Sequence, residues 1–268
     1  MQMKTIMAMA ALFGATAPAA SAASFTNGGF ESGTFAGWTL GAGYRGNTDN
    51  ASLTTAALLP GGALYNSTIN HSAVIGTGYV DPNVGNLLGT TVYSGNYSAR
   101  IEDTTSGGYA SVVSQTVTNY TDANIFFAWK AVLQNGGHSE DESAEMLIEL
   151  TDNNTGVVIL REQFNAGASG TGIDTRFSQF SDFYYTPTWQ IEQITLTGAQ
   201  IGHSFTLSVL AADCEPTGHT GYAYLDGFGA TTPPPVITPP GTAVPEPASF
   251  LLLGAGMVGM AAARRKRA

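Results

Sequence analysis

The chain has almost no cysteine. Cys214 is the single cysteine in 268 residues. One thiol cannot form an intramolecular disulfide, even in an oxidising compartment. The folded chain must therefore be stabilised by a packed core, with or without a bound metal ion.

Basic residues are also scarce. The chain has 10 Lys and Arg against 20 Asp and Glu, and half of the basic residues are Lys4 and the four at 264–267. The rest of the chain keeps five, which are Arg45, Arg100, Lys130, Arg161 and Arg176. Such an acidic chain repels phosphate backbones, so we expect no nucleic-acid partner. Divalent cations, neutral glycans and a hydrated matrix remain compatible with this charge.

Amphipathic helical patterns are missing between the two ends of the chain. Short alternating runs separated by turn residues are typical of β-strands, and residues 152–156 predict a hairpin turn. Strands are expected at 73–75, 97–102, 110–117, 125–133, 144–151, 157–164, 191–196, 205–211 and 223–228. Residues 41–64 are expected to be loop with one short helical turn. This pattern predicts an all-β, jelly-roll-like antiparallel β-sandwich.

The N-terminus has the features of a secretory signal. Residues 1–4 form a short n-region with the basic residue Lys4, residues 6–15 are apolar, and Ala20 and Ala22 satisfy the rule of small residues before a cleavage site. The sequence predicts a signal helix in a signal peptide spanning 1–22, with Sec-type export through the inner membrane.

The C-terminus combines a polar motif, an apolar run and a basic end. The motif is Val244, Pro245, Glu246 and Pro247, and the end is Arg264, Arg265, Lys266 and Arg267. The apolar run, 248–263, is at or just under the ~17–25 residues of a full span, which predicts a short transmembrane helix with its basic end in the cytoplasm. Its weak hydrophobicity favours a transient sorting signal over a permanent anchor.

These C-terminal residues resemble the PEP-CTERM sorting tail of Gram-negative bacteria. The resemblance implies processing by an exosortase, transient residence in the inner membrane, and delivery to the cell surface or extracellular matrix. A Thr/Pro-rich stretch precedes the tail and predicts a semi-rigid linker. We therefore expect a signal peptide at 1–22, a β-sandwich domain at 23–230, a linker at 231–243 and a sorting signal at 244–268.

A second resemblance lies at the two ends of the sandwich. Residues 25–31, FTNGGFE, followed by Gly37-Trp38, look like the opening strand of galactose-binding-like, carbohydrate-binding-module jelly rolls, and residues 222–228, YAYLDGF, look like their last strand. In those proteins the first and last strands lie side by side and clamp a structural calcium. The resemblance implies that Glu31 and Asp226 bind Ca²⁺ with their side chains and Asn27 with its carbonyl. The alternative is two exposed carboxylates at strand ends.

Aromatic residues offer a second kind of candidate site. Most aromatics in alternating runs are expected to be core residues, Trp38 and Trp129 among them. Tyr184, Tyr185 and Trp189, beside Pro187 in an expected loop, are the better candidates for an exposed platform that stacks on sugar rings.

Two further groups of polar residues could bind a metal ion. His138 precedes three acidic residues, Glu140, Asp141 and Glu142, but such a cluster between strands is typical of a solvated loop. Cys214 and His219 alone fall short of a zinc site, which needs more ligands. We interpret Cys214 as a small buried group and His219 as a hydrogen-bonded turn residue.

Catalytic motifs are missing. No HExxH is present, and residues 167–171, GASGT, break the G-x-S-x-G pattern at its last position. The G-x-G-x-x-G match at 254–259 lies inside the apolar tail, where small residues favour helix packing. We therefore expect an exported, non-catalytic protein of the cell surface or exopolysaccharide matrix, as in biofilms. One alternative is a carbohydrate-binding module with a defined glycan ligand, and another is a glycan-active enzyme with two convergent carboxylates.

Overall fold

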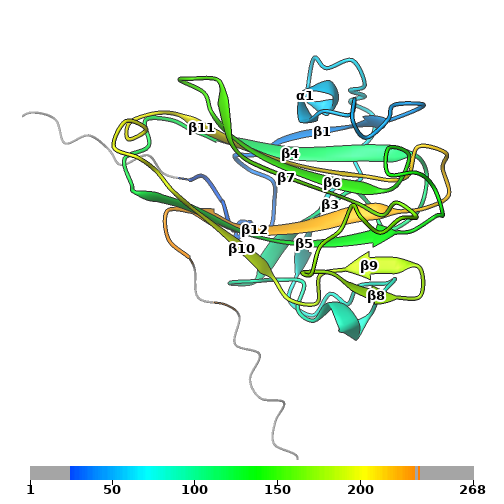
Figure 1. The fold of residues 1–268 in the computed structure, drawn as a ribbon. Helices are drawn as coiled ribbons and strands as arrows, with labels where there is room; N and C mark the ends of the chain where they lie inside the picture. Colours follow the sequence, from blue (N-terminus) through cyan, green and yellow to red (C-terminus); the bar gives the residue numbers. More distant parts are fainter. Residues whose placement is uncertain (1–24, 233–234, 236–268) are drawn as a thin grey trace, which may run out of the picture.

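The computed structural model describes residues 25–232 and Pro235, and these form two antiparallel sheets packed face to face (Figure 1). The all-β sandwich predicted from the alternating runs is therefore confirmed. The expected signal helix, most of the linker and the whole sorting tail lie outside the described residues. Within the described part of the chain, no helix is long and apolar enough to cross a membrane.

The first sheet has five strands in the order β1-β4-β11-β6-β7. Their bounds are Thr39–Tyr44 for β1, Tyr109–Val117 for β4, Phe205–Ala212 for β11, Glu145–Asp152 for β6 and Val157–Asn165 for β7. The turn predicted at 152–156 joins β6 to β7: the Asp152 carboxylate accepts a hydrogen bond from Asn154 N, and Gly156 has a φ of 71°.

The second sheet has seven strands, six of them in the order β2-β3-β12-β5-β9-β8, while β10 pairs with another part of β5. The bounds are Ala73–Gly76 for β2, Tyr97–Ile101 for β3, Asn124–Gln134 for β5, Ser178–Phe180 for β8, Phe183–Tyr185 for β9, Gln190–Thr195 for β10 and Gly221–Gly229 for β12. All nine predicted strands are present within two residues of their expected ends.

Alternation along the strands builds the core between the sheets. In β5, Phe127, Trp129 and Ala131 point into that core, whereas Lys130 and Val132 point to the outer face of the sheet. Trp38 and Trp129 are both buried there, as predicted. The apolar surface buried in this core stabilises the fold without a disulfide.

Each sheet also has a covered outer face. The segment with α1 (Thr55–Leu58) packs Leu53 and Leu58 on the first sheet, and Thr54 caps this short helix by accepting a hydrogen bond from Ala57 N. The segment with η1 (Asn86–Leu88) packs Val84 and Leu88 on the second sheet. The predicted helical turn within 41–64 is α1.

Three sequence expectations about local structure were wrong. Residues 25–38 form successive turns rather than an opening strand, because Asn27 and Phe30 take φ values of 56° and 59°. Strand β1 occupies the start of the region expected to be loop. The segment around Tyr184 was also expected to be loop but contains β8 and β9, which form a hairpin.

Candidate functional site

Glu31 and Asp226 meet at one cavity, although they are far apart in the sequence. Asp226 lies in β12 where the pairing with β5 is interrupted by an irregularity between Asp226 and Gly229, a local feature that commonly re-aims a side chain. Glu31 follows the turn at 27–30. Both residues line a cavity of about 210 Å³ that Ser94, Gly95 and Thr231 also border.

A loop between β2 and β3 holds both carboxylates. Asp226 Oδ2 accepts hydrogen bonds from Tyr93 N at 2.9 Å and Ser94 N at 3.0 Å. Glu31 Oε1 accepts from Asn96 N at 2.9 Å and Tyr97 N at 3.1 Å. Loop 93–97 was missed by the sequence analysis, although the Ser-Gly-Asn turn before a strand was a signal that could have identified it.

The second oxygen of Asp226 has no partner among the described residues. Asp226 is fully buried, its Oδ1 makes no hydrogen bond, and burial raises the pKa of its carboxyl to about 7. A side chain at Gly29 would place its Cβ 3.4 Å from this oxygen. A buried, unpaired carboxylate oxygen beside a second carboxylate is a suitable donor set for a hard cation such as Ca²⁺. The cavity is smaller than the ~300–1,000 Å³ typical of organic ligands.

Asn27 does not line this cavity. Its carbonyl oxygen accepts hydrogen bonds from Phe30 N and Trp38 Nε1, both at 3.0 Å, and its amide donates to Thr34 O at 2.8 Å. Because that carbonyl is already used twice, Asn27 organises the turn before Glu31 instead of joining Glu31 and Asp226 at the cavity.

The three predicted sugar-stacking residues do not form an exposed loop platform. Tyr184 and Tyr185 belong to β9, where Tyr185 is buried and Tyr184 packs partly against the core. Trp189 is half-buried and lies edge-on to Tyr93, with Lys130 Nζ 5.5 Å from its ring. The prediction of an exposed position was wrong because the strand pairing of β9 with β5 draws this segment onto the sheet.

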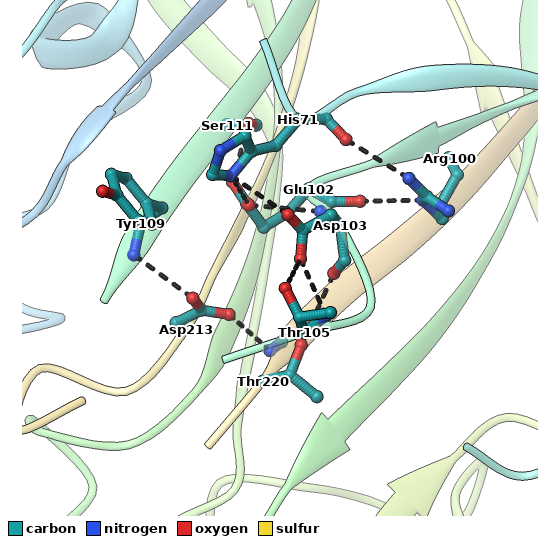
Figure 2. A network of polar contacts seen from close by, with 10 residues as sticks. His71, Arg100, Glu102, Asp103, Thr105, Tyr109, Ser111, Asp213 and Thr220 are labelled. Carbon is teal, nitrogen blue, oxygen red and sulfur yellow. Dashed lines mark hydrogen bonds and ion pairs between the residues drawn. The ribbon is translucent and has the colours of Figure 1, made fainter. Parts of the chain in front are cut away.

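A buried polar network at one end of the sandwich was not anticipated (Figure 2). Glu102 is fully buried with a φ of 64°. It accepts hydrogen bonds from Ser111 Oγ at 2.7 Å and shares a 2.5 Å contact with His71 Nδ1, which raises the pKa of His71. Nearby, the Asp213 carboxylate accepts from Tyr109 N and Gly221 N, and burial together with the Glu102 charge raises its pKa to about 7.

The geometry of this network differs from that of a hydrolytic triad. In a triad the hydroxyl bonds to the imidazole and the imidazole bonds to the acid. Here Ser111 and His71 both bond to the same carboxylate, that of Glu102, and Ser111 is fully buried. The arrangement joins the residue after β3 to β4, and the hydroxyl of Ser111 bonds to the Glu102 carboxylate and not to the imidazole of His71.

Comparison with known proteins identifies the C-terminal tail. A family model described as the PEP-CTERM protein-sorting motif matches residues 243–267, so the predicted sorting motif is confirmed. No curated protein matches the chain.

Several solved β-sandwich structures are distantly similar. The carbohydrate-binding module TmCBM61, solved with β-1,4-galactotriose, is 13% identical, with 78% of this chain and 97% of that chain covered and a TM-score of 0.38. A carbohydrate-binding module specific for non-crystalline cellulose, CBM28, is 11% identical, with 75% of this chain and 91% of that chain covered and a TM-score of 0.37. The K1 adhesin domain of Lys-gingipain from Porphyromonas gingivalis W83 is 10% identical over 74% and 92%, with a TM-score of 0.33. At this distance no ligand is inferred from them.

Proposed function

We propose that this chain is an exported, non-catalytic β-sandwich protein that an exosortase delivers to the cell surface or the exopolysaccharide matrix. The observation that carries this proposal is the sorting motif at 243–267, which follows a folded domain whose last described strand ends at Gly229. In this reading residues 1–22 are a signal peptide cleaved after Ala22, 23–230 are the sandwich, 231–243 are a linker and 244–268 are the sorting signal.

A structural Ca²⁺ ion is part of this proposal. Glu31 and Asp226 would hold it, with further oxygens from backbone groups around the cavity. When bound, the ion supplies the positive charge that the buried carboxylate lacks. The chain's own contribution is to fix both carboxylates through loop 93–97, so that the turns at 27–31 and strand β12 are fastened together.

Sorting can be tested by following the tail. The full chain is expressed in a Gram-negative host with its exosortase and in the same host lacking it, and terminal peptides are identified by mass spectrometry. We expect a tailless form at the cell surface in the first host and only a membrane-bound precursor in the second. Replacing Pro245 and Pro247 with alanine should reproduce the second result, whereas the same change at Pro239 and Pro240 in the linker should not. Identical processing in both hosts would overturn the proposal.

Carbohydrate binding is the second candidate, and an aromatic strip favours it. Tyr44 is 50% exposed and lies edge-on to Tyr109 at 5.6 Å, and Tyr109 lies edge-on to His71 at 4.7 Å. Figure 2 shows Tyr109 and His71 beside the carboxylates of the polar network. The exposed ring of Tyr44 could stack on the apolar face of a sugar, while the polar groups beside Tyr109 and His71 could form hydrogen bonds with the sugar hydroxyls.

This candidate predicts that Tyr44→Ala weakens binding to an exopolysaccharide at least about tenfold, since truncating an aromatic hot-spot residue costs ~2 kcal/mol or more and ~1.4 kcal/mol is a factor of ten. A glycan array followed by titration calorimetry measures it. Phe180→Ala is the matched control, because Phe180 is 49% exposed but lies on β8, among the strands of the other sheet. If both variants keep the same saturable binding, the glycan does not bind at the aromatic strip of Tyr44, Tyr109 and His71.

A further inference from the structure

Three potential metal ligands from different parts of the chain meet at the end of the sandwich where β5 and β11 end and β12 begins. Cys214 follows β11, His219 precedes β12, and His138 lies in the connection after β5. One ligand atom from each of the three residues lies within 4.8 Å of the other two. Cys214 is buried and the two imidazoles are half-buried.

Two of the three separations between the ligand atoms are close to those that a single metal ion requires. His138 Nε2 lies 3.1 Å from His219 Nδ1, and Cys214 Sγ lies 3.4 Å from the same nitrogen. Tetrahedral zinc, with Zn–N of about 2.0–2.1 Å and Zn–S of about 2.3 Å, separates two nitrogen ligands by about 3.3 Å and a nitrogen from a sulfur by about 3.6 Å. The two measured separations are within about 0.2 Å of these values.

His219 Nδ1 also has more neighbours than hydrogen bonding can satisfy. A ring nitrogen carries either one proton or one lone pair, yet both His138 and Cys214 lie within contact distance of this atom. A metal ion placed among the three atoms would use the lone pairs of both imidazoles and the thiolate together.

The surrounding backbone is shaped to hold these rings. A Cβ at Gly136 would lie 2.2 Å from His219 Nδ1, so only glycine permits this approach. Cys214 N donates to His219 O at 2.9 Å, which closes the loop between β11 and β12, and Ala168 N donates to His138 O at 2.8 Å. Such support from strand ends positions ligands more precisely than a free loop does.

A second cluster, His71 with Glu102 and Asp103, offers a useful contrast. Glu102 already accepts hydrogen bonds from Ser111 Oγ and Asp103 N in addition to its contact with His71. Its oxygens are therefore satisfied without an ion. In the cluster at Cys214 the donor atoms contact only one another, among the side-chain contacts of the described residues.

The geometry points to a binding site for a transition metal ion of intermediate softness, represented by Zn²⁺, with Cys214, His138 and His219 as its three protein ligands. Thiolate and imidazole donors select such ions over Ca²⁺ and Mg²⁺. The fourth position is left for water or for a carboxylate; Asp182 lies close enough for its charge to act on His219. The ion joins the connections that follow β5 and β11 and thereby fastens the two sheets at this end.

Cobalt absorption tests the ligand set directly. The metal-free full chain is titrated with Co²⁺, and we expect a thiolate-to-cobalt band in the near ultraviolet together with visible bands of a tetrahedral ion. Cys214→Ser should abolish the near-ultraviolet band, and excess Zn²⁺ should displace the cobalt from the unmodified chain. Absence of the band in the unmodified chain, or its persistence in Cys214→Ser, overturns the proposal.

Thermal stability with Zn²⁺ provides the second readout. We expect Zn²⁺ to raise the melting temperature of the unmodified chain, and His138→Gln to weaken zinc affinity at least about tenfold, the lower limit seen even for residues that only support ligands. His203→Gln is the control, because this half-buried histidine pairs with Asp152 away from the site. Equal weakening by both variants, or a response to Ca²⁺ in place of Zn²⁺, contradicts the assignment. The zinc response does not depend on the sorting proposal, so a failure of surface sorting would leave the zinc response unchanged.

Discussion

Removing Ca²⁺ from the full chain is expected to lower its melting temperature by about 5–10 °C, and Asp226→Asn is expected to abolish that change. A ligand present at about 100 times its Kd stabilises by about 2.7 kcal/mol, and a domain of this size shifts by about 2–4 °C per kcal/mol. Asparagine keeps the oxygen that accepts from Tyr93 N and Ser94 N but cannot present a second anionic oxygen to the ion.

In the presence of chelator, the same substitution should not lower the melting temperature. Asp226 Oδ1 is buried without a hydrogen-bond partner, and an unsatisfied buried polar atom costs about 1–3 kcal/mol. Burial also disfavours the charged form of this carboxyl and raises its pKa to about 7. Asparagine removes the cost of burying that charge, so the calcium-free variant should melt at the same temperature as the calcium-free parent or higher. Differential scanning calorimetry with and without chelator measures both effects.

Two further variants make this experiment specific. Glu31→Gln should also lose the calcium response, because Glu31 borders the same cavity. Asp122→Asn, at an exposed aspartate, should keep the full response. A calcium response that survives in Asp226→Asn would remove Ca²⁺ from this cavity and leave the β-sandwich itself unaffected.

Glu145→Gln is expected to stabilise the chain at pH 8 by about 2–3 kcal/mol and to change little at pH 4. Glu145 is fully buried; its Oε2 accepts from Gln163 Nε2 at 3.0 Å, while its Oε1 has no partner. Burial raises the pKa of this carboxyl from 4.5 to about 7. Each unit of pKa difference corresponds to about 1.4 kcal/mol.

The sign follows from proton linkage. Between pH 4.5 and about 7 the folded chain holds the Glu145 proton more tightly than the unfolded chain does, so stability at this group falls as the pH rises through that window. Glutamine cannot titrate, and its unfolding free energy should lack this slope. Urea denaturation at pH 4, 6 and 8 measures it, with Glu149→Gln as the control at a partly exposed carboxylate paired with Arg161. Parallel pH profiles for Glu145→Gln and the parent would contradict the prediction.

The strands could be predicted because one residue in two is apolar where a sheet has one buried side. In β3, Ala99 and Ile101 lie in the core and alternate with the polar Ser98 and Arg100, which identifies both the strand and its inward face. The short hairpin β8–β9 could not be recognised, since its strands are held by pairing with β5 and carry no long alternating pattern of their own.

The candidate sites were predictable only in part, for a related reason. That Glu31 and Asp226 lie together followed from resemblance at the two ends of the domain, and the structure places them at one cavity. The turns around Asn27 depend on positive φ values, which cannot be predicted from the spacing of apolar and polar residues. In the sequence, Cys214 and His219 offer only two ligands, which are too few for a zinc site. The third, His138, lies far away in the sequence and approaches them only because β5 pairs with β12.

The central position of β12 determines when this molecule can fold during its synthesis. β12 lies between β3 and β5, yet among the described residues Gly221–Gly229 form the last strand to be synthesised. Until they emerge, the middle of the second sheet is missing and the facing edges of β3 and β5 stay open. Closing such long-range pairs is slow. The second sheet therefore cannot close until synthesis of the described part of the chain is almost complete, whereas all five strands of the first sheet are available before β12.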